Sequence, residues 1–411
     1  MNVSKPAPLD LSTAVDLPAR WTRLDKYLAF GIAFVAAAIL AFGLAVDGIG
    51  MSPDSHSYME AALNIASGKG VLTGAGDAAR PMVRWPPGYP ILLLPGAVTP
   101  VGVNLWAAVL SVILLGALEA GVFLLLRKLG VRTSASLLAA GLLFTAHGLL
   151  LNFGMMLSEA PFLVLELALI AALTRDNDSA PFRWLALAGV FAALATLTRF
   201  AGQGLIVGLC GYVLLAGMHS LRSRVGRTLC FFAFAQVPVG LWLLRNWLLT
   251  GGVSDLGYAS RPFEPEPFKV IWRVLMTYWF PEELPRLLRH GANLVLFGIM
   301  AFSIWRRRSQ LSPMMRKTCV MCLAAAFGYC VFLLYTVFTS AAQPYTDFRM
   351  LLPVVLPLVI LMAIAEHAVS GRWRAVLLGL CVTILLIGVV RMSMSVLNMR
   401  THGAHFAWYE H

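Results

Sequence analysis

The chain has 411 residues, of which 59% are hydrophobic and 13% are charged, and its formal net charge is +12. In a soluble domain roughly a quarter of the residues would be charged. The composition therefore excludes an ordinary soluble protein and predicts a polytopic membrane protein. Lys and Arg lie between the apolar segments rather than in a basic stripe with interleaved aromatic residues, which excludes a nucleic-acid partner.

The apolar segments predict an all-α bundle. Residues 1–26 form a predicted cytoplasmic tail, because Arg20, Arg23 and Lys26 precede the first apolar segment. Apolar segments of roughly 17–25 residues can cross a bilayer, and they predict about eleven spans in a membrane domain over 27–391. The predicted spans cover residues 27–46, 103–126, 134–152, 160–174, 184–198, 202–218, 228–248, 291–305, 318–338, 350–367 and 375–391. Alternation of the basic segments predicts two long external loops, about 47–100 and 249–290, and a short external tail over 392–411.

The first external loop begins with the stretch "SPDSHSYMEAALNIASGKG". Ser52 is a favourable helix cap and Gly68 a favourable helix end, so the stretch predicts a short amphipathic helix on the membrane surface. Asp54 and Tyr58 lie one turn apart and share a face of that helix. Asp54 is either a functional carboxylate or simply part of the cap. His56 could orient Asp54 or bind a metal ion, although a lone histidine is a weak metal signal.

The loop continues into "RWPPGYP", which contains Arg84, Trp85 and Tyr89. Its prolines stiffen the approach to the second span. A rigid external loop with a carboxylate, an arginine and aromatic residues suits a substrate that has a charged head and a lipid tail.

Further ionisable residues stand at the predicted external ends of other spans. They are Glu159 in "LSEAPF", Arg199 in "LTRFAG", Arg245 in "LLRNWLLTGG", and Asp347 with Arg349 in "TDFRMLLP". Such groups are costly at a membrane boundary unless they are paired or hydrated, so their recurrence on one side predicts a site. For any single arginine, the alternative is that its side chain snorkels to the interface.

Two acidic residues, Glu119 and Glu166, fall inside predicted spans. They indicate either a helix–helix hydrogen bond by a protonated acid or an ion pathway.

At these residues the chain resembles the GT-C superfamily of membrane glycosyltransferases, which use polyprenyl-phosphate sugars. It is most similar to the bacterial branch of the lipid A aminoarabinose transferases, which itself resembles the protein O-mannosyltransferases. The matching features are the first-loop acid with its Tyr and Gly, "PP-x-YP", "SE-x-x-F", "LTR-x-x-G", "RN" followed by "TG", and "R-x-LLP-x-x-P". One departure is that Asp54 is followed by Ser55, where the superfamily often has an adjacent acidic pair.

The resemblance implies a GT-C-like bundle and a hexosyl- or pentosyltransferase that inverts the anomeric carbon. The donor would be a polyprenyl-phosphate sugar. The acceptor would be a hydroxyl on a cell-envelope lipid, glycan or protein, at the periplasmic face of a bacterial inner membrane. The implied roles are a base for Asp54, a second carboxylate for Glu159, phosphate binding for Arg84, Arg199, Arg245 and Arg349, and sugar or acceptor binding for His56, Tyr58, Trp85, Tyr89 and Asp347. The loop 249–290 would cover the site. Some members use Mg²⁺ or Mn²⁺ and others do not, so a metal cofactor is left open.

Two other classes compete with this hypothesis. A transporter or flippase of lipid-linked sugars would place its charges at mid-span, with Gly/Pro-broken helices in matching halves. Here the ionisable residues concentrate at the external ends and no internal repeat is seen, which favours catalysis at the surface. A ligase or polymerase of the O-antigen type would use a diphosphate lipid, and the first-loop acid argues against it.

Overall fold

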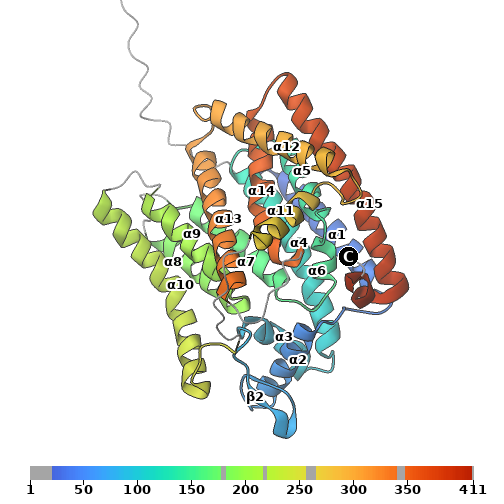
Figure 1. Cartoon of the computed structure of the whole chain (residues 1–411), viewed down its shortest axis with the longest axis vertical. Coiled ribbons are helices and arrows are strands. Elements are labelled where there is room, and N and C mark those ends of the chain that lie inside the picture. The colour runs from blue at the N-terminus through green and yellow to red at the C-terminus, as the bar shows by residue number, and fades with distance from the viewer. Residues whose placement is uncertain (1–20, 177–181, 216–219, 256–264, 340–347, 410–411) are drawn as a thin grey trace, which may run out of the picture.

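The computed structural model describes residues 21–176, 182–215, 220–255, 265–339 and 348–409. Within these ranges the chain folds into a helical bundle with a cap of loop elements at one end (Figure 1). The bundle helices are α1 (Arg23–Leu44), α4 (Val103–Lys128), α5 (Thr133–Phe144), α6 (Leu149–Phe153), α7 (Glu159–Thr174), α8 (Arg183–Thr198), α9 (Gly202–Leu215), α10 (Leu221–Thr250), α11 (Glu266–Thr277), α12 (Arg286–Arg306), α13 (Pro313–Thr339), α14 (Phe348–Ala368) and α15 (Arg372–Tyr409).

Helix α14 is the centre of the bundle. It contacts α5, α7, α12 and α13. In its apolar 18-residue stretch 78% of the residues are buried, against 22–50% in the corresponding stretches of the other long apolar helices. This helix is apolar on every side, which is the pattern of a helix surrounded by other helices. Its central position fixes the place of Arg349, the second residue of the helix as described.

Each predicted span corresponds to a helix, with two differences. The segment 134–152 is broken into α5 and α6, because Gly148 adopts a left-handed conformation with φ +79° between them. Helix α15 continues beyond the predicted end of its span at residue 391, and after a non-helical kink at Gly403 (φ +82°) the chain is again helical as far as Tyr409. Seven of the described helices are long and apolar enough to cross a membrane. Four predicted spans correspond to α5, α7, α8 and α9, which have only 12 to 16 residues, so the count of eleven stays a prediction.

The cap is built from α2 (Pro53–Ala66), the strands β1 (Leu72–Thr73) and β2 (Arg80–Pro81), a 3₁₀ turn at Gly76–Ala78, and α3 (Gly88–Val98). Figure 1 shows these elements together at one end of the bundle, near the C-terminal end of α10. We call this end the loop face. Helix α2 starts as predicted, because Ser52 and Ser55 form a reciprocal capping box and Pro53 occupies the first turn.

A two-stranded sheet departs from the all-α prediction in the described ranges, as does an isolated parallel bridge between Gly50 and Met155. Strands β1 and β2 pair antiparallel, with Leu72 opposite Pro81 and Thr73 opposite Arg80. Strands of two residues carry no alternating pattern, so nothing in the sequence signalled them.

Candidate active site

The beginnings of α2 and α7 are held together by the backbone. Gly50 donates a hydrogen bond to the Gly154 carbonyl (2.8 Å), and Met156 donates one to the Gly50 carbonyl (2.9 Å). The Ser55 hydroxyl adds a bond to the Met156 carbonyl (2.8 Å). The carboxylates in the first turns of these two helices, Asp54 and Glu159, are therefore brought to one side of the loop face.

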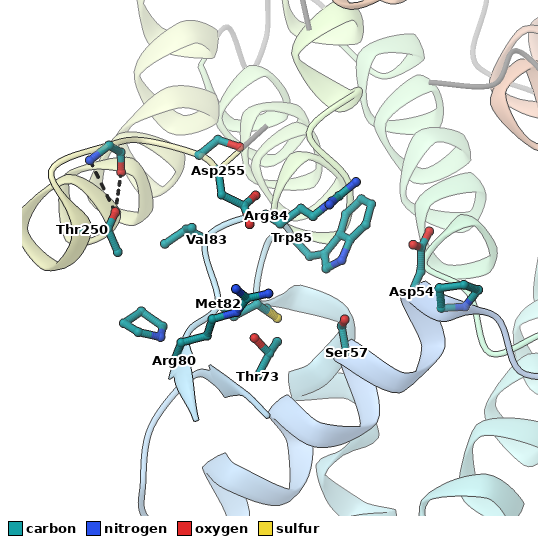
Figure 2. A pocket seen from close by; sticks show the side chains of 14 residues that line it. Asp54, Ser57, Thr73, Arg80, Met82, Val83, Arg84, Trp85, Thr250 and Asp255 are labelled. Carbon is teal, nitrogen blue, oxygen red and sulfur yellow. Dashed lines mark hydrogen bonds between the residues drawn. The ribbon is translucent and has the colours of Figure 1, made fainter. Parts of the chain in front are cut away.

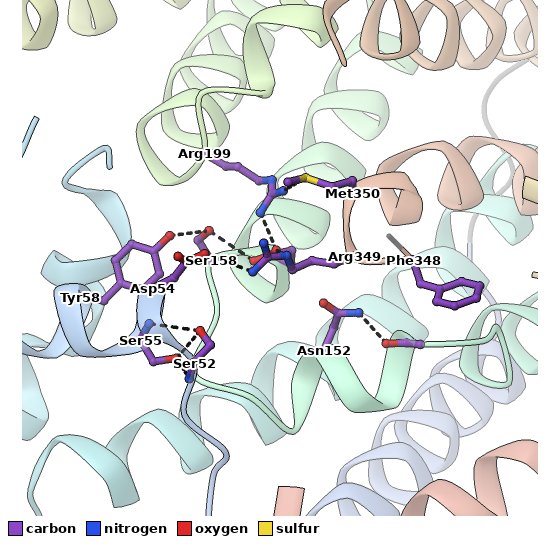
Figure 3. Close-up of polar contacts among 12 residues, drawn as sticks. Ser52, Asp54, Ser55, Tyr58, Asn152, Ser158, Arg199, Phe348, Arg349 and Met350 are labelled. Carbon is purple, nitrogen blue, oxygen red and sulfur yellow. Dashed lines mark hydrogen bonds and ion pairs between the residues drawn. The ribbon is translucent and has the colours of Figure 1, made fainter. Parts of the chain in front are cut away.

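Two arginines join these carboxylates into one network (Figure 3). Arg349 reaches Asp54 Oδ2 with Nη1 and Glu159 Oε1 with Nε, both at 3.1 Å. Arg199 reaches the same Glu159 oxygen with Nη1 at 2.5 Å. The network thus connects α2, α7, the end of α8 and the beginning of α14.

The two carboxylates differ in their exposure. The Glu159 side chain is 2% exposed, and the two guanidinium groups compensate the cost of burying its charge. The Asp54 side chain is 21% exposed and stands at the outer end of the network. Both acids lie in the first turn of a helix, where the helix dipole favours negative charge. Asp54 is therefore the carboxylate that a substrate can reach.

Aromatic residues support the network from the side of α2. The Tyr58 hydroxyl donates to Ser158 Oγ (3.2 Å), and Ser158 Oγ donates to Glu159 Oε2 (3.4 Å). The Tyr58 ring stands edge-on to Tyr89 at 5.1 Å, and Trp85 lies 6.1 Å away. Burial, and then the charges of Asp54 and Glu159, raise the pKa of Tyr58 above its usual value. Tyr58 and Tyr89 are buried supports, whereas Trp85 reaches the pocket described next.

A pocket of about 490 Å³ opens beside Asp54 (Figure 2). Its walls come from the start of α2, from β1, from the segment 80–85, and from the end of α10 with the residues that follow it. The lining residues are Pro53, Asp54, Ser57, Thr73, Arg80, Pro81, Met82, Val83, Arg84, Trp85, Thr250, Gly252, Ser254 and Asp255. The pocket therefore combines two carboxylates, those of Asp54 and Asp255, with two arginines and an indole ring.

The wall that carries Trp85 is positioned by close contact with α8. A Cβ atom on Gly88 would lie 2.5 Å from the Leu197 carbonyl oxygen, so only glycine permits this approach. The contact places the "RWPPGYP" segment next to the end of α8, where Arg199 joins the network.

The structure separates the predicted site residues into three groups. It gathers Asp54, Tyr58, Glu159, Arg199 and Arg349 in the network and its support, and it places Arg84 and Trp85 in the pocket beside them.

The second group is separated from the pocket. His56 has an exposed side chain that does not line it, because residues two positions apart on a helix point in different directions. Tyr89 is buried. Arg245 is not a lining residue, and its guanidinium binds the carbonyl oxygens of Val71 and Met82.

The third group has one member, Asp347, which lies outside the described residues. Of the loop 249–290, the residues Thr250, Gly252, Ser254 and Asp255 line the pocket.

Sequence reasoning missed other lining residues, chiefly Arg80, Ser57, Thr73 and Asp255. The nearest available signal was the stretch "ARPMVRWPP", in which Arg80 stands four residues before Arg84 in the same stiff loop. Spacing in a loop does not reveal a side chain's direction, so this signal was weak.

The divalent metal that the sequence left open finds no ready set of ligands among the described residues. Across the ranges that the structure describes, no three His, Cys, Asp or Glu side chains are close enough to hold a metal ion. Asp54 and Glu159 are joined through the Arg349 guanidinium, so a cation already occupies the position between them. The described residues therefore show no ready site for Mg²⁺ or Mn²⁺, and we assign no step to a metal.

Glu119 and Glu166 are fully buried in α4 and α7. Neither carboxyl group has a hydrogen-bond partner among the described residues, so the predicted helix–helix hydrogen bond is not found there. An ion pathway through these residues stays a prediction.

Comparison with known proteins identifies the fold. No protein-family model matches the sequence, and no curated protein matches it. ArnT from Cupriavidus metallidurans bound to undecaprenyl phosphate aligns with a TM-score of 0.54 and 14% identity, over 94% of this chain and 74% of ArnT. ArnT in the apo state gives a TM-score of 0.52 and 16% identity, over 94% and 75%.

The archaeal oligosaccharyltransferase AglB from Archaeoglobus fulgidus, in complex with an inhibitory peptide and a dolichol-phosphate, shares the same architecture. It aligns with a TM-score of 0.52 and 12% identity, over 91% of this chain and 56% of AglB. The chain therefore spans about three-quarters of ArnT and little more than half of AglB. At these identities the likeness establishes the fold, and the predicted GT-C-like membrane fold is confirmed.

Proposed function

We propose that this protein is a glycosyltransferase that moves a sugar from a polyprenyl-phosphate donor to an acceptor hydroxyl on a cell-envelope lipid, glycan or protein. The observation that carries the proposal is the position of Asp54, which is held by Arg349 and lines a pocket with two arginines. The shared fold supports it, because one ArnT structure with that fold holds undecaprenyl phosphate.

The proposed reaction uses Asp54 as the base. Arg349 binds Oδ2 of this carboxylate, and within the described residues Oδ1 has no partner and remains for the acceptor. The acceptor oxygen attacks the anomeric carbon while its proton passes to Asp54. The bond between that carbon and the phosphate oxygen breaks, and the polyprenyl phosphate leaves with the electron pair. A single displacement of this kind inverts the anomeric carbon.

Glu159 acts as a positioning residue in this proposal. Its carboxylate is buried behind Asp54 and holds Arg199 and Arg349. Arg349 in turn fixes the orientation of the Asp54 carboxylate. Fixing a base by a neighbouring ion pair lowers the cost of reaching the reactive geometry.

The loop face is proposed to lie on the periplasmic side of a bacterial inner membrane, with the N-terminus in the cytoplasm. The support is the distribution of Lys and Arg between the apolar segments. A lipid-linked donor would then reach the pocket from the outer leaflet.

The test is sugar transfer by the purified protein in lipid nanodiscs, supplied with polyprenyl-phosphate sugars and an envelope glycan extract. Asp54→Asn is expected to lower turnover by about 100-fold or more, because the base is lost while the shape of the side chain is kept. Asp77→Asn is the matched control, since Asp77 is exposed in the 3₁₀ turn and does not line the pocket. Equal turnover of Asp54→Asn and the wild type would refute the assigned role of Asp54.

The same purified protein, reconstituted into vesicles, distinguishes the transporter alternative. A wild-type protein that transfers no sugar but moves a fluorescent lipid-linked sugar across a vesicle membrane would be a flippase. We expect transfer without such movement.

A further inference from the structure

The hairpin between Val71 and Met82 is fixed to α2 along one side. Asn64 Nδ2 donates to the carbonyls of Leu72 and Gly74, both at 3.0 Å, and Glu60 accepts the Gly74 amide at 2.8 Å. Gly74 has φ +85°, and a Cβ atom there would lie 2.5 Å from the Ala78 carbonyl oxygen. The hairpin is therefore a defined structure and not a loose loop.

Arg245 fixes the same hairpin from α10. Its Nη2 donates to the Val71 carbonyl (2.9 Å) and its Nη1 to the Met82 carbonyl (3.0 Å). Val71 precedes β1 and Met82 follows β2, so one guanidinium binds both ends of the hairpin. Nη1 also donates to Asn246 Oδ1 (3.0 Å), and the group lies 4.6 Å from the centre of the Trp242 ring. The planar fork of guanidinium donors suits this pair of hydrogen bonds, and a lysine, whose donors share one nitrogen, does not reproduce its geometry.

This arrangement changes which cations are available to a phosphate. Arg245 uses its terminal nitrogens on the hairpin and on Asn246, while Arg199 and Arg349 bind carboxylates. Two arginines line the pocket, Arg80 on β2 and Arg84 just after it. In the part of the chain that is described, neither guanidinium forms an ion pair or a hydrogen bond, and Arg84 lies 5.4 Å from the centre of the Trp85 ring. Figure 2 shows Arg80 extending from the hairpin toward the pocket.

We infer that Arg80 and Arg84 bind the phosphate of the donor, and that Arg245 is a positioning residue that holds the hairpin so that Arg80 faces the pocket. The identity of the ligand as a polyprenyl phosphate rests on the proposed function. The leaving phosphate gains negative charge as the sugar departs, and two guanidinium groups would stabilise that charge with charge-assisted hydrogen bonds. Arg245, for which the resemblance implied phosphate binding, would then act on the phosphate only through the hairpin.

The test measures binding of undecaprenyl phosphate to the intact protein in nanodiscs, with undecaprenol as the probe that lacks phosphate. Arg80→Gln is expected to weaken binding of the phosphate by about 10- to 100-fold and to leave undecaprenol unchanged, because one charge-assisted contact is lost. Lys69→Gln is the matched control. Lys69 is an exposed cation of the same loop that does not line the pocket, and its substitution should change neither affinity.

Hydrogen exchange of the Met82 amide, which is bonded to the Val71 carbonyl, separates positioning from direct binding. Arg245→Gln and Arg245→Lys should both accelerate this exchange and weaken phosphate binding, whereas Arg80→Gln should leave the exchange unchanged. Arg245→Lys keeps the positive charge. If this variant exchanges the Met82 amide faster but keeps the wild-type affinity for undecaprenyl phosphate, Arg245 acts by its charge, and its positioning role is overturned.

Wild-type affinity of Arg80→Gln for undecaprenyl phosphate would overturn the assignment of Arg80. Neither measurement requires turnover. A protein that binds the phosphate through Arg80 but transfers no sugar would therefore refute the proposed function and leave this site standing.

Discussion

Two of the buried glutamates in the described residues are paired with arginines, Glu159 at the loop face and Glu366 near the other end of α14. Their side chains are only 2% and 3% exposed. Each binds two arginines, which are Arg199 and Arg349 for Glu159, and Arg132 and Arg374 for Glu366. By charge and burial alone the two clusters would be judged equivalent.

The surroundings of the two clusters differ. Arg132 also donates to the carbonyls of Glu366 and His367 (2.7 and 2.6 Å), so this cluster ties α14 to the beginning of α5. Its arginines are 35% and 39% exposed. At the loop face the arginines are 18% exposed or less, and Arg349 extends the network to Asp54 and thus to the pocket. A buried ion cluster is therefore a site only where a further group connects it to a space for a ligand.

The largest expected effect comes from Glu159→Gln. The substitution leaves Arg199 and Arg349 without their buried carboxylate, and removing one partner from a buried pair costs about 3 kcal/mol or more. Arg349 then no longer holds Asp54 in place. We expect turnover to fall about 100-fold or more and the midpoint of thermal unfolding in detergent to drop. Near-normal turnover in this variant would show that Asp54 is positioned without Glu159.

The counterpart, Glu366→Gln, should affect stability without affecting catalysis. Its arginines are more exposed, so water replaces part of the lost interaction, and we expect a loss of about 1–2 kcal/mol in unfolding free energy. Turnover per folded molecule should equal that of the wild type in the nanodisc assay. If turnover falls as far as it does for Glu159→Gln, the distinction between the two clusters is wrong.

Much of this architecture could be predicted from the sequence, because helix ends and membrane sidedness have strong local signals. Ser52 and Pro53 predicted the start of α2. The length of the apolar segments, together with the charged residues beside them, predicted the bundle helices. Asp54, Glu159, Arg199 and Arg349 are up to 295 residues apart in sequence. The structure gathers them because each stands at a helix end on the same face.

Which groups each arginine side chain binds could not be predicted in the same way. Arg245 stands at a helix end on the loop face, as Arg199 does, but it binds backbone carbonyls of a hairpin that the sequence did not reveal. The direction of Arg80 depends on that hairpin as well. His56 is a different case, since helical geometry already places it on another face from Asp54.

The smallest effect is expected from Tyr58→Phe, which tests how much Tyr58 supports the network of Asp54, Glu159, Arg199 and Arg349. Tyr58→Phe removes one hydrogen bond, from the hydroxyl to Ser158, while the ring keeps its contacts with Tyr89 and Trp85. Such a bond contributes about 1 kcal/mol, so turnover should fall by about fivefold at most. A loss as large as that of Asp54→Asn would instead make Tyr58 a participant in the reaction.

The pH dependence of the same variant sharpens this point. Burial raises the pKa of Tyr58 above its usual value of 10.0, so the phenol stays protonated in neutral and mildly alkaline assays. The pH profiles of turnover should therefore coincide for wild type and Tyr58→Phe between about pH 6 and pH 9. Because the folded-state pKa is raised, the stabilising contribution of Tyr58 is complete below about pH 10 and is lost as the pH rises further. The wild type should lose more stability than Tyr58→Phe above about pH 10, and an alkaline fall in turnover near pH 9 that is absent from Tyr58→Phe would contradict the role of a buried support.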